Sequence, residues 1–165
     1  MKFAKRRRKE NKTDYLKRTK LLKGEKPRVV FRKTNRYLII QYITSENAQD
    51  KVEIGMDSRI LLEYGWPKEF SNSLKSIPAA YLIGFLVAKK IKKAKMENPI
   101  VDFGMTKVLH KSKTYSFIKG LIDGGIKIKC EDNMFPEKER ILGKNLKEDF
   151  SKHFEKIKKE IEKNE

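Results

Sequence analysis

The feature that most constrains the fold is an apolar run of 12 residues at positions 77–88. It begins a predicted helix that extends to residue 95, with Ser76 as the N-cap and Pro78 in the first turn. The run is too short to cross a bilayer, which takes about 20 apolar residues. Because a helix that is apolar on nearly every side cannot face water, we expect its first half to be buried on a sheet of a soluble protein.

The segments before this helix have the composition of strands. Residues 29–31 and 37–43 are rich in β-branched and aromatic side chains, and the residues between them include Asn35 at a turn position, which predicts a hairpin. After a polar loop at 44–50, residues 51–56 place Val52, Ile54 and Met56 on one side, as a third antiparallel strand does. A short helical turn capped by Asp57 or Ser58 follows.

The segments after the helix alternate between the two types of structure. We expect a buried strand at 100–103, a helix at 114–123 closed by two glycines, and a short final strand at 126–128. A surface segment at 135–143 leads to an amphipathic helix in the C-terminal segment 144–165, with its apolar stripe at Leu146, Phe150, Phe154, Ile157 and Ile161. The order predicts an α/β fold, with helices on a mixed sheet that contains an antiparallel hairpin.

The charge is concentrated at the start of the chain. The formal net charge is +18, and residues 1–36 contain 16 Lys or Arg against 3 Asp or Glu, whereas residues 37–136 contain 15 against 11. Such an excess indicates a polyanionic partner, because an isolated chain repels itself. Nucleic acid is the first candidate, and a membrane surface is not expected because the basic arm lacks apolar anchors. RNA is favoured over DNA, since no helix-turn-helix or zinc finger is visible.

The basic region divides into an arm and a helix. Residues 1–12 have one large apolar side chain, Phe3, so we expect them to be disordered until they bind. Thr13 or Asp14 then caps a predicted helix that ends at Lys23, with Gly24 after it. A helix this short has to dock on the domain or on the partner. The predicted units are therefore a basic RNA-binding arm and helix at 1–26, an α/β core at 27–143 and a C-terminal helix at 144–165.

The aromatic residues Tyr15, Phe31 and Tyr37 lie among these cations and are candidates to stack on unpaired bases, as in RNA recognition. A solvated basic face or a nuclear-localisation stretch is the alternative reading of the same cations. Two further groups are equally well explained as phosphate contacts or as solvated charges. They are the lysines at 89–95 and the set Lys107, His110, Lys111, Lys113 and Lys119.

An enzyme would need candidate catalytic groups. Asp57, Asp102 and Asp123 stand at the ends of predicted elements, where a two-metal nuclease would place carboxylates, but helix caps and turns account for all three. The single cysteine, Cys130, excludes an intrachain disulfide and a multi-cysteine metal site, and it indicates a reducing compartment. We expect no catalysis, no cofactor and no metal.

Several blocks of the chain resemble the archaeal type of the large-subunit ribosomal protein L18 family. They are KTDYLKRTKLLK at 12–23, KPRVVFRKTN at 26–35, EYGW at 63–66, PAAYLIG at 78–84, DFG at 102–104 and SKTYSF with GLIDGG at 112–125. They occur in the family's order and span about residues 5–143. The resemblance implies a ribonuclease-H-like topology of the translational-machinery class and a cytoplasmic, ribosomal protein without catalytic activity. It also implies a structural role in the large subunit.

The implied partners are 5S rRNA, the large-subunit rRNA to which the protein helps attach it in the central protuberance, and neighbouring ribosomal proteins, with ribosomal protein L5 expected among them. The long C-terminal extension of eukaryotic relatives has no counterpart here. The resemblance assigns RNA contacts to Arg6, Arg7, Arg8, Tyr15, Arg18, Lys26, Arg28, Arg32, Lys33, Asn35 and Arg36, and the basic helix and aromatic pattern add Lys20, Lys23 and Tyr37. A free RNA chaperone or RNA-processing factor is the alternative function.

Overall fold

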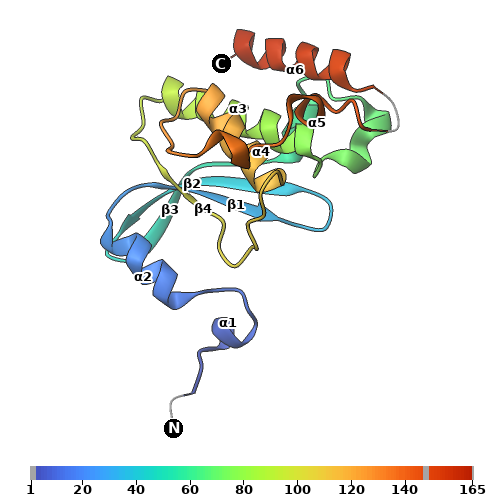
Figure 1. Ribbon diagram of the computed structural model, residues 1–165. Helices are drawn as coiled ribbons and strands as arrows, with labels where there is room; N and C mark the ends of the chain where they lie inside the picture. The colour runs from blue at the N-terminus through green and yellow to red at the C-terminus, as the bar shows by residue number, and fades with distance from the viewer. Residues whose placement is uncertain (1–2, 147–148, 165) are drawn as a thin grey trace.

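The computed structural model describes residues 3–146 and 149–164 and contains one four-stranded sheet in the order β3-β2-β1-β4 (Figure 1). The strands are β1 (Arg28–Lys33), β2 (Leu38–Glu46), β3 (Gln49–Asp57) and β4 (Ile100–Asp102). β1 pairs antiparallel with β2, β2 pairs antiparallel with β3, and β4 pairs parallel with β1. The predicted mixed sheet with its antiparallel hairpin is therefore confirmed.

Helices cover one face of the sheet. The helices and helical turns are α1 (Arg6–Lys9), α2 (Tyr15–Lys23), η1 (Ser58–Leu62), η2 (Lys68–Ser73), α3 (Ile77–Lys93), α4 (Lys113–Asp123), η3 (Asp132–Met134), α5 (Lys138–Leu142) and α6 (Ser151–Asn164). In Figure 1, α3, α4 and α6 lie on one side of the sheet, while α1 and α2 lie on the other. None of the helices in the described ranges is long and apolar enough to span a membrane.

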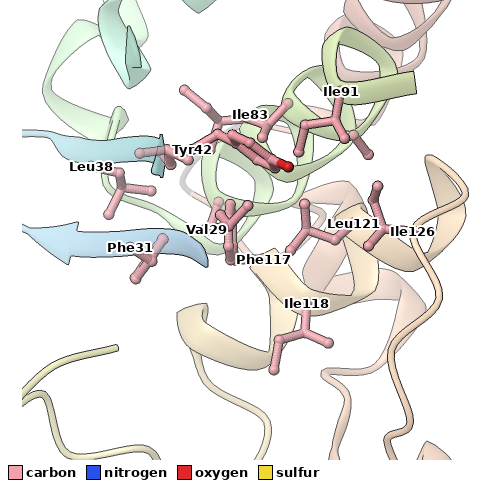
Figure 2. Packing of buried hydrophobic residues seen from close by; sticks show 14 of the residues in the cluster. Val29, Phe31, Leu38, Tyr42, Ile83, Ile91, Phe117, Ile118, Leu121 and Ile126 are labelled. Carbon is pink, nitrogen blue, oxygen red and sulfur yellow. The ribbon is translucent and has the colours of Figure 1, made fainter. Parts of the chain in front are cut away.

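Side chains of alternate residues on β1 and β2 form the floor of the main core. Val29, Phe31 and Leu38 pack against Ile83 of α3 and Phe117 of α4, and Figure 2 shows these side chains converging from the sheet and the two helices. The rings of Phe31 and Phe117 lie 4.7 Å apart, between centroids. Because β1 uses its odd-numbered residues for this core, its even-numbered residues face the opposite side of the sheet.

A second apolar cluster covers the other side of α3. Leu82 and Leu86 of this helix pack there with Trp66, and Phe154 and Ile157 of α6 complete the cluster. The helix therefore lies between the sheet with α4 on one side and α6 on the other, which explains why its sequence is apolar nearly all round. The predicted apolar stripe of the C-terminal segment is buried at Phe150, Phe154, Ile157 and Ile161, although α6 begins only at Ser151.

Two predicted loop segments and one predicted strand are wrong. The polar loop expected at 44–50 is mostly strand, because β2 and β3 continue to a two-residue turn at Asn47 and Ala48, which have φ values of 48° and 64°. Segment 126–128 forms no strand: Ile126 is buried in the core, but the backbone of this segment pairs with no strand. The surface segment at 135–143 contains a helix, α5, with Ile141 buried.

Glycines set the separation between α3 and α4. A Cβ at Gly120 would lie 2.2 Å from the carbonyl oxygen of Tyr81, and a Cβ at Gly84 would lie 2.5 Å from the carbonyl oxygen of Phe117. Both obstacles are backbone atoms, so a side chain at either position would force the helices apart. The tight packing of α4 on α3 thus depends on two residues that have no side chain.

We expect Gly120→Ala to lower the free energy of unfolding by about 2 kcal/mol or more, because the added methyl overpacks a backbone contact. Gly24→Ala is the matched control: its φ is −78° and its nearest non-neighbouring atom is 3.4 Å away, so alanine fits. Denaturant unfolding of both variants measures the difference. Equal stabilities would show that α4 can shift without cost.

Candidate nucleic-acid interface

The predicted basic helix is present as α2, and its start is fixed by Asp14. This carboxylate accepts hydrogen bonds from the backbone N–H groups of Leu16 and Lys17 at 3.0 and 3.2 Å. At the other end Gly24 keeps a right-handed conformation, and Glu25 adopts the left-handed one with a φ of 49°. None of the residues of α2 is fully buried, and only Leu21 and Leu22 among its aliphatic side chains are half-buried, so apolar packing alone does not hold this helix on the domain.

Asp50 provides the first attachment of α2. It accepts a hydrogen bond from Arg18 of α2 at 2.8 Å and another from Arg28 of β1 at 2.7 Å. Arg28 also donates to the hydroxyl of Ser45, which in turn donates to Asp50. The Arg28 side chain is only 3% exposed. One carboxylate therefore joins a cation of the helix to a buried cation of the sheet.

Asp102 provides the second attachment in the same way. Arg32 of β1 donates to its carboxylate at 2.8 Å and to its carbonyl oxygen at 2.8 Å, while Lys17 of α2 lies 3.9 Å from the same carboxylate. Lys17 also donates to the carbonyl oxygen of Gly104 at 3.3 Å. The two attachments lie along β1, because Arg28 and Arg32 are both on the face opposite the core.

The pKa values of both carboxyl groups reflect these contacts. Burial alone would raise the pKa of Asp50, but hydrogen bonds from Arg18 and Ser45 and the charges of Arg28 and Arg18 hold it below its ordinary value. Burial likewise opposes ionisation of Asp102, and the hydrogen bonds from Arg32 and the Gly104 N–H, with the charges of Arg32 and Lys17, lower its pKa. Both groups are therefore ionised near neutral pH.

A cavity of about 140 Å³ lies between α2 and the open face of the sheet. Its lining is mostly cationic and consists of Arg7, Lys12, Thr13, Asp14, Lys17, Arg18, Leu21, Arg28, Arg32, Asp102 and Gly104. Residues of the arm, the helix and two strands thus meet at one place.

The arm before α2 was predicted to be disordered, but its described part contains the one-turn helix α1. Local polar contacts hold it: Arg7 donates to the hydroxyl of Thr13 at 2.9 Å, Arg8 lies 3.4 Å from Asp14, and the Lys5 ammonium lies 4.6 Å from the ring centroid of Tyr15. No residue of α1 is buried, so its three arginines remain on the surface.

The structure separates the 14 predicted RNA-binding residues by exposure. Arg6, Arg7, Arg8, Lys20, Lys23, Lys26, Lys33, Asn35 and Arg36 are exposed, Tyr15, Arg18, Arg32 and Tyr37 are half-buried, and Arg28 is buried. The Arg28 guanidinium is buried in its ion pair with Asp50, so it is not exposed for the RNA contact that we expected.

These residues form two groups. The first group is the arm, α2 and the even-numbered residues of β1, which lie on the open face of the sheet. The second group is the hairpin end at 33–37, which follows the C-terminal end of β1. Phe31, which we considered for base stacking, is wrong for that role because it is completely buried in the core. Two exposed apolar side chains near the arm, Phe3 and Leu16, are 81% and 68% exposed.

Sequence reasoning missed the residues that hold α2 in place. Lys17, Asp50 and Asp102 are not among the RNA-binding residues that the sequence predicts, and the sequence indicates only a loop at Asp50 and a turn or metal ligand at Asp102. Their role depends on strand pairing, since Val30 stands opposite Asp102 across β1 and β4 and so brings Arg32 near it. No local signal in the sequence marks these contacts.

The three carboxylates considered for a nuclease lie in separate surroundings. Asp57 caps η1 and pairs with Arg59, and Asp102 pairs with Arg32. Asp123 accepts a hydrogen bond from the Tyr81 hydroxyl at 2.6 Å. Burial is the main cause of the raised pKa of Tyr81, and this hydrogen bond raises it further. Among the residues that the structure describes, no three His, Cys, Asp or Glu side chains are grouped so as to hold a metal ion.

Comparison with known proteins agrees with the sequence blocks. Residues 1–100 match the model of a family described as ribosomal large subunit proteins 60S L5 and 50S L18. The chain is 43% identical over 141 residues to the large ribosomal subunit protein uL18 of Korarchaeum cryptofilum, covering 86% of this chain and 70% of that protein. The identity to uL18 of Methanoregula boonei is 38% over 141 residues, covering 86% and 79%, and to uL18 of Methanospirillum hungatei 36% over 143 residues, covering 87% and 79%.

We expect Asp50→Asn to lower the free energy of unfolding by about 2 to 3 kcal/mol, because it leaves the buried Arg28 guanidinium without a counter-charge. Glu53→Gln, on the same strand and in an exposed pair with Lys51, is the control and should leave stability unchanged. Denaturant unfolding at neutral pH compares the two. A control that loses as much as Asp50→Asn would refute the special role of the buried pair.

Acid should weaken the attachment of α2. Groups with a lowered pKa in the folded state contribute stability that is fully present above the unfolded value of about 4, and this stability is lost as pH falls through the folded pKa. Asp50 and Asp102 are two such groups. We therefore expect the free energy of unfolding, measured from pH 7 down to pH 2, to fall less steeply below pH 4 in the double variant Asp50→Asn/Asp102→Asn than in the wild type.

Proposed function

Because this chain belongs to the L18 family of large-subunit ribosomal proteins, we propose that it binds 5S rRNA and helps to attach it to the large-subunit rRNA in the central protuberance. As a member of that family it is a structural constituent of the cytoplasmic ribosome. We propose ribosomal protein L5 as its neighbour there.

The observation that carries the proposal is the attachment of α2 to β1 through Asp50 and Asp102. Asp50 forms ion pairs with Arg18 and Arg28. Asp102 forms ion pairs with Lys17 and Arg32. The remaining cations of the region, among them Lys20, Lys23 and Lys26, are exposed. The result is a positively charged surface whose orientation is set by ion pairs inside the protein.

Such a surface binds RNA by neutralising phosphates and releasing counterions. The arm adds three further positive charges, those of Arg6, Arg7 and Arg8 on α1, none of which is buried. A fixed arrangement of cations on α2 favours one folded RNA shape over other polyanions, because the phosphates must match positions that are already set. Tyr15 and Tyr37 are half-buried and are the aromatic residues of this region that we assign to base contacts.

We also propose a division of labour along the chain. Residues 1–26 are the basic RNA-binding arm and helix, residues 27–143 form the α/β core that holds β1 and carries Tyr37, and residues 144–165 complete this core through α6. The burial of the α6 side chains Phe154, Ile157 and Ile161 supports this last role.

We expect the protein to bind 5S rRNA more tightly than tRNA in filter-binding assays at raised salt, where non-specific phosphate contacts are weakened. Equal affinities for the two RNAs would contradict the proposal and would favour a general RNA chaperone.

The arm is tested by the triple variant Arg6→Gln/Arg7→Gln/Arg8→Gln. Its affinity for 5S rRNA should depend less steeply on salt, by roughly 0.7 to 0.9 in the log–log slope for each phosphate contact removed. Lys152→Gln/Lys156→Gln/Lys159→Gln changes the net charge equally on the exposed side of α6 and should leave the slope as it is. The same slope in both triple variants would exclude specific contacts by the arm.

A further inference from the structure

Three lysines from distant parts of the chain meet at the end of β1 away from Arg28. Lys33 is the last residue of β1, Lys75 precedes α3, and Lys113 is the first residue of α4. Together with Thr34 and Leu38 they line a cavity of about 210 Å³. We call Lys33, Lys75 and Lys113 the lysine cluster.

The lysine cluster lacks a carboxylate partner among the described residues 3–146 and 149–164. No carboxylate in the part of the chain that the structure describes lies within ion-pair distance of its three ammonium groups, and Lys75 donates a hydrogen bond to the carbonyl oxygen of Asn35. Lys113 is half-buried, and burial and the charges of Lys75 and Lys33 lower its pKa. By contrast, the half-buried and buried arginines of β1 are paired with carboxylates.

The positive region extends past the lysine cluster. Lys33 and Lys113 also line a neighbouring cavity of about 430 Å³, whose other charged or titratable residues are Lys107, His110, Lys111 and Arg140. Of these, Lys111 is paired with Glu137 at 3.4 Å. The cavity also includes Ser112 and Thr114 at the start of the 11-residue helix α4. The Ser112 hydroxyl contacts the Thr114 hydroxyl and caps no backbone N–H, so the positive end of the helix dipole adds to the cations.

This region lies on the other side of the sheet from α2. Side chains alternate along β1, so Arg32 faces α2 through Asp102 while Lys33 faces the side that carries α3 and α4. Figure 1 shows α2 on one side of the sheet and α3 and α4 on the other, so an RNA strand held by the arm and α2 would lie on the opposite face from the lysine cluster.

We propose that the lysine cluster, with Lys107 and Arg140 beside it, is a second phosphate-binding site that holds an RNA backbone segment separate from the one bound by the arm and α2. The inference rests on the proposed function and deepens it, because it divides the two RNA contacts between the two faces of the sheet. A phosphate backbone fits better than an isolated anion, since two adjoining cavities share Lys33 and Lys113 and offer several cations in a row.

The test compares Lys33→Gln/Lys75→Gln/Lys113→Gln with the control Lys68→Gln/Lys127→Gln/Lys129→Gln, which removes three exposed lysines elsewhere. Two affinities are measured: that of the protein for 5S rRNA alone, and that of the preformed protein–5S rRNA complex for deproteinised large-subunit rRNA. The cluster variant should keep the first affinity within about twofold and lose about tenfold or more of the second, with a salt slope shallower by roughly two to three. The control variant should keep both.

Stability gives an independent readout. Because the three ammonium groups repel one another, the cluster variant should melt at the same temperature as the wild type or higher. A clear fall in melting temperature would mean that the lysines support the fold, and this would overturn the inference.

Lysine acylation in purified large subunits gives the decisive outcomes. We expect Lys33, Lys75 and Lys113 to be protected there and to become reactive after nuclease treatment. Protection that survives nuclease would identify a protein partner in place of RNA, and full reactivity in the intact subunit would show an unoccupied surface; either result overturns the inference. A variant that loses affinity for 5S rRNA as strongly as for the second RNA overturns the division between the two faces. Failure of the wild type to prefer 5S rRNA over tRNA would count against the proposed function and not against this site.

Discussion

The basic surface depends on two carboxylates, Asp50 and Asp102, each of which holds one cation of α2 and one cation of β1. A nine-residue helix with no buried residue is not stable by itself in water. Its place on the domain therefore depends on ion pairs, and the attachment at Asp50 includes a guanidinium that is almost fully buried. Removing a carboxylate would leave that charge uncompensated, which makes the attachment sensitive to a single substitution.

These ion pairs need a rigid strand to attach to, and the core provides it. β1 presents Val29 and Phe31 to the helices on one face and Arg28 and Arg32 to α2 on the other. The apolar face is held by α3 and α4, whose backbones approach closely at Gly84 and Gly120, and α6 covers the outer side of α3. The same strand thus joins the apolar core to the charged surface through the alternation of its side chains.

The charge of +18 includes cations with different roles. Arg28 and Arg32 are paired inside the protein and orient α2, whereas the arginines of α1 are exposed to a partner. The lysine cluster is a third kind, because its members come together with no carboxylate among the described residues that line their cavity. Counting charges along the chain finds the basic region but does not distinguish these roles, since each role is defined by what lies across the sheet.

The sequence by itself determined the elements whose signals are local. The uniform apolarity of residues 77–88 predicted α3, the β-branched hairpin predicted β1 with β2, and a cap at Thr13 or Asp14 predicted the start of α2. The strand expected at 126–128 does not form, because Ile126 and Ile128 pack into the core while the backbone of this segment pairs with no strand. Only the tertiary structure decided that Arg28 is internal, that Phe31 is buried and that Lys33 meets Lys75 and Lys113. Those facts depend on strand register and on the face to which each side chain points, and a shift of one residue would reverse every one of them.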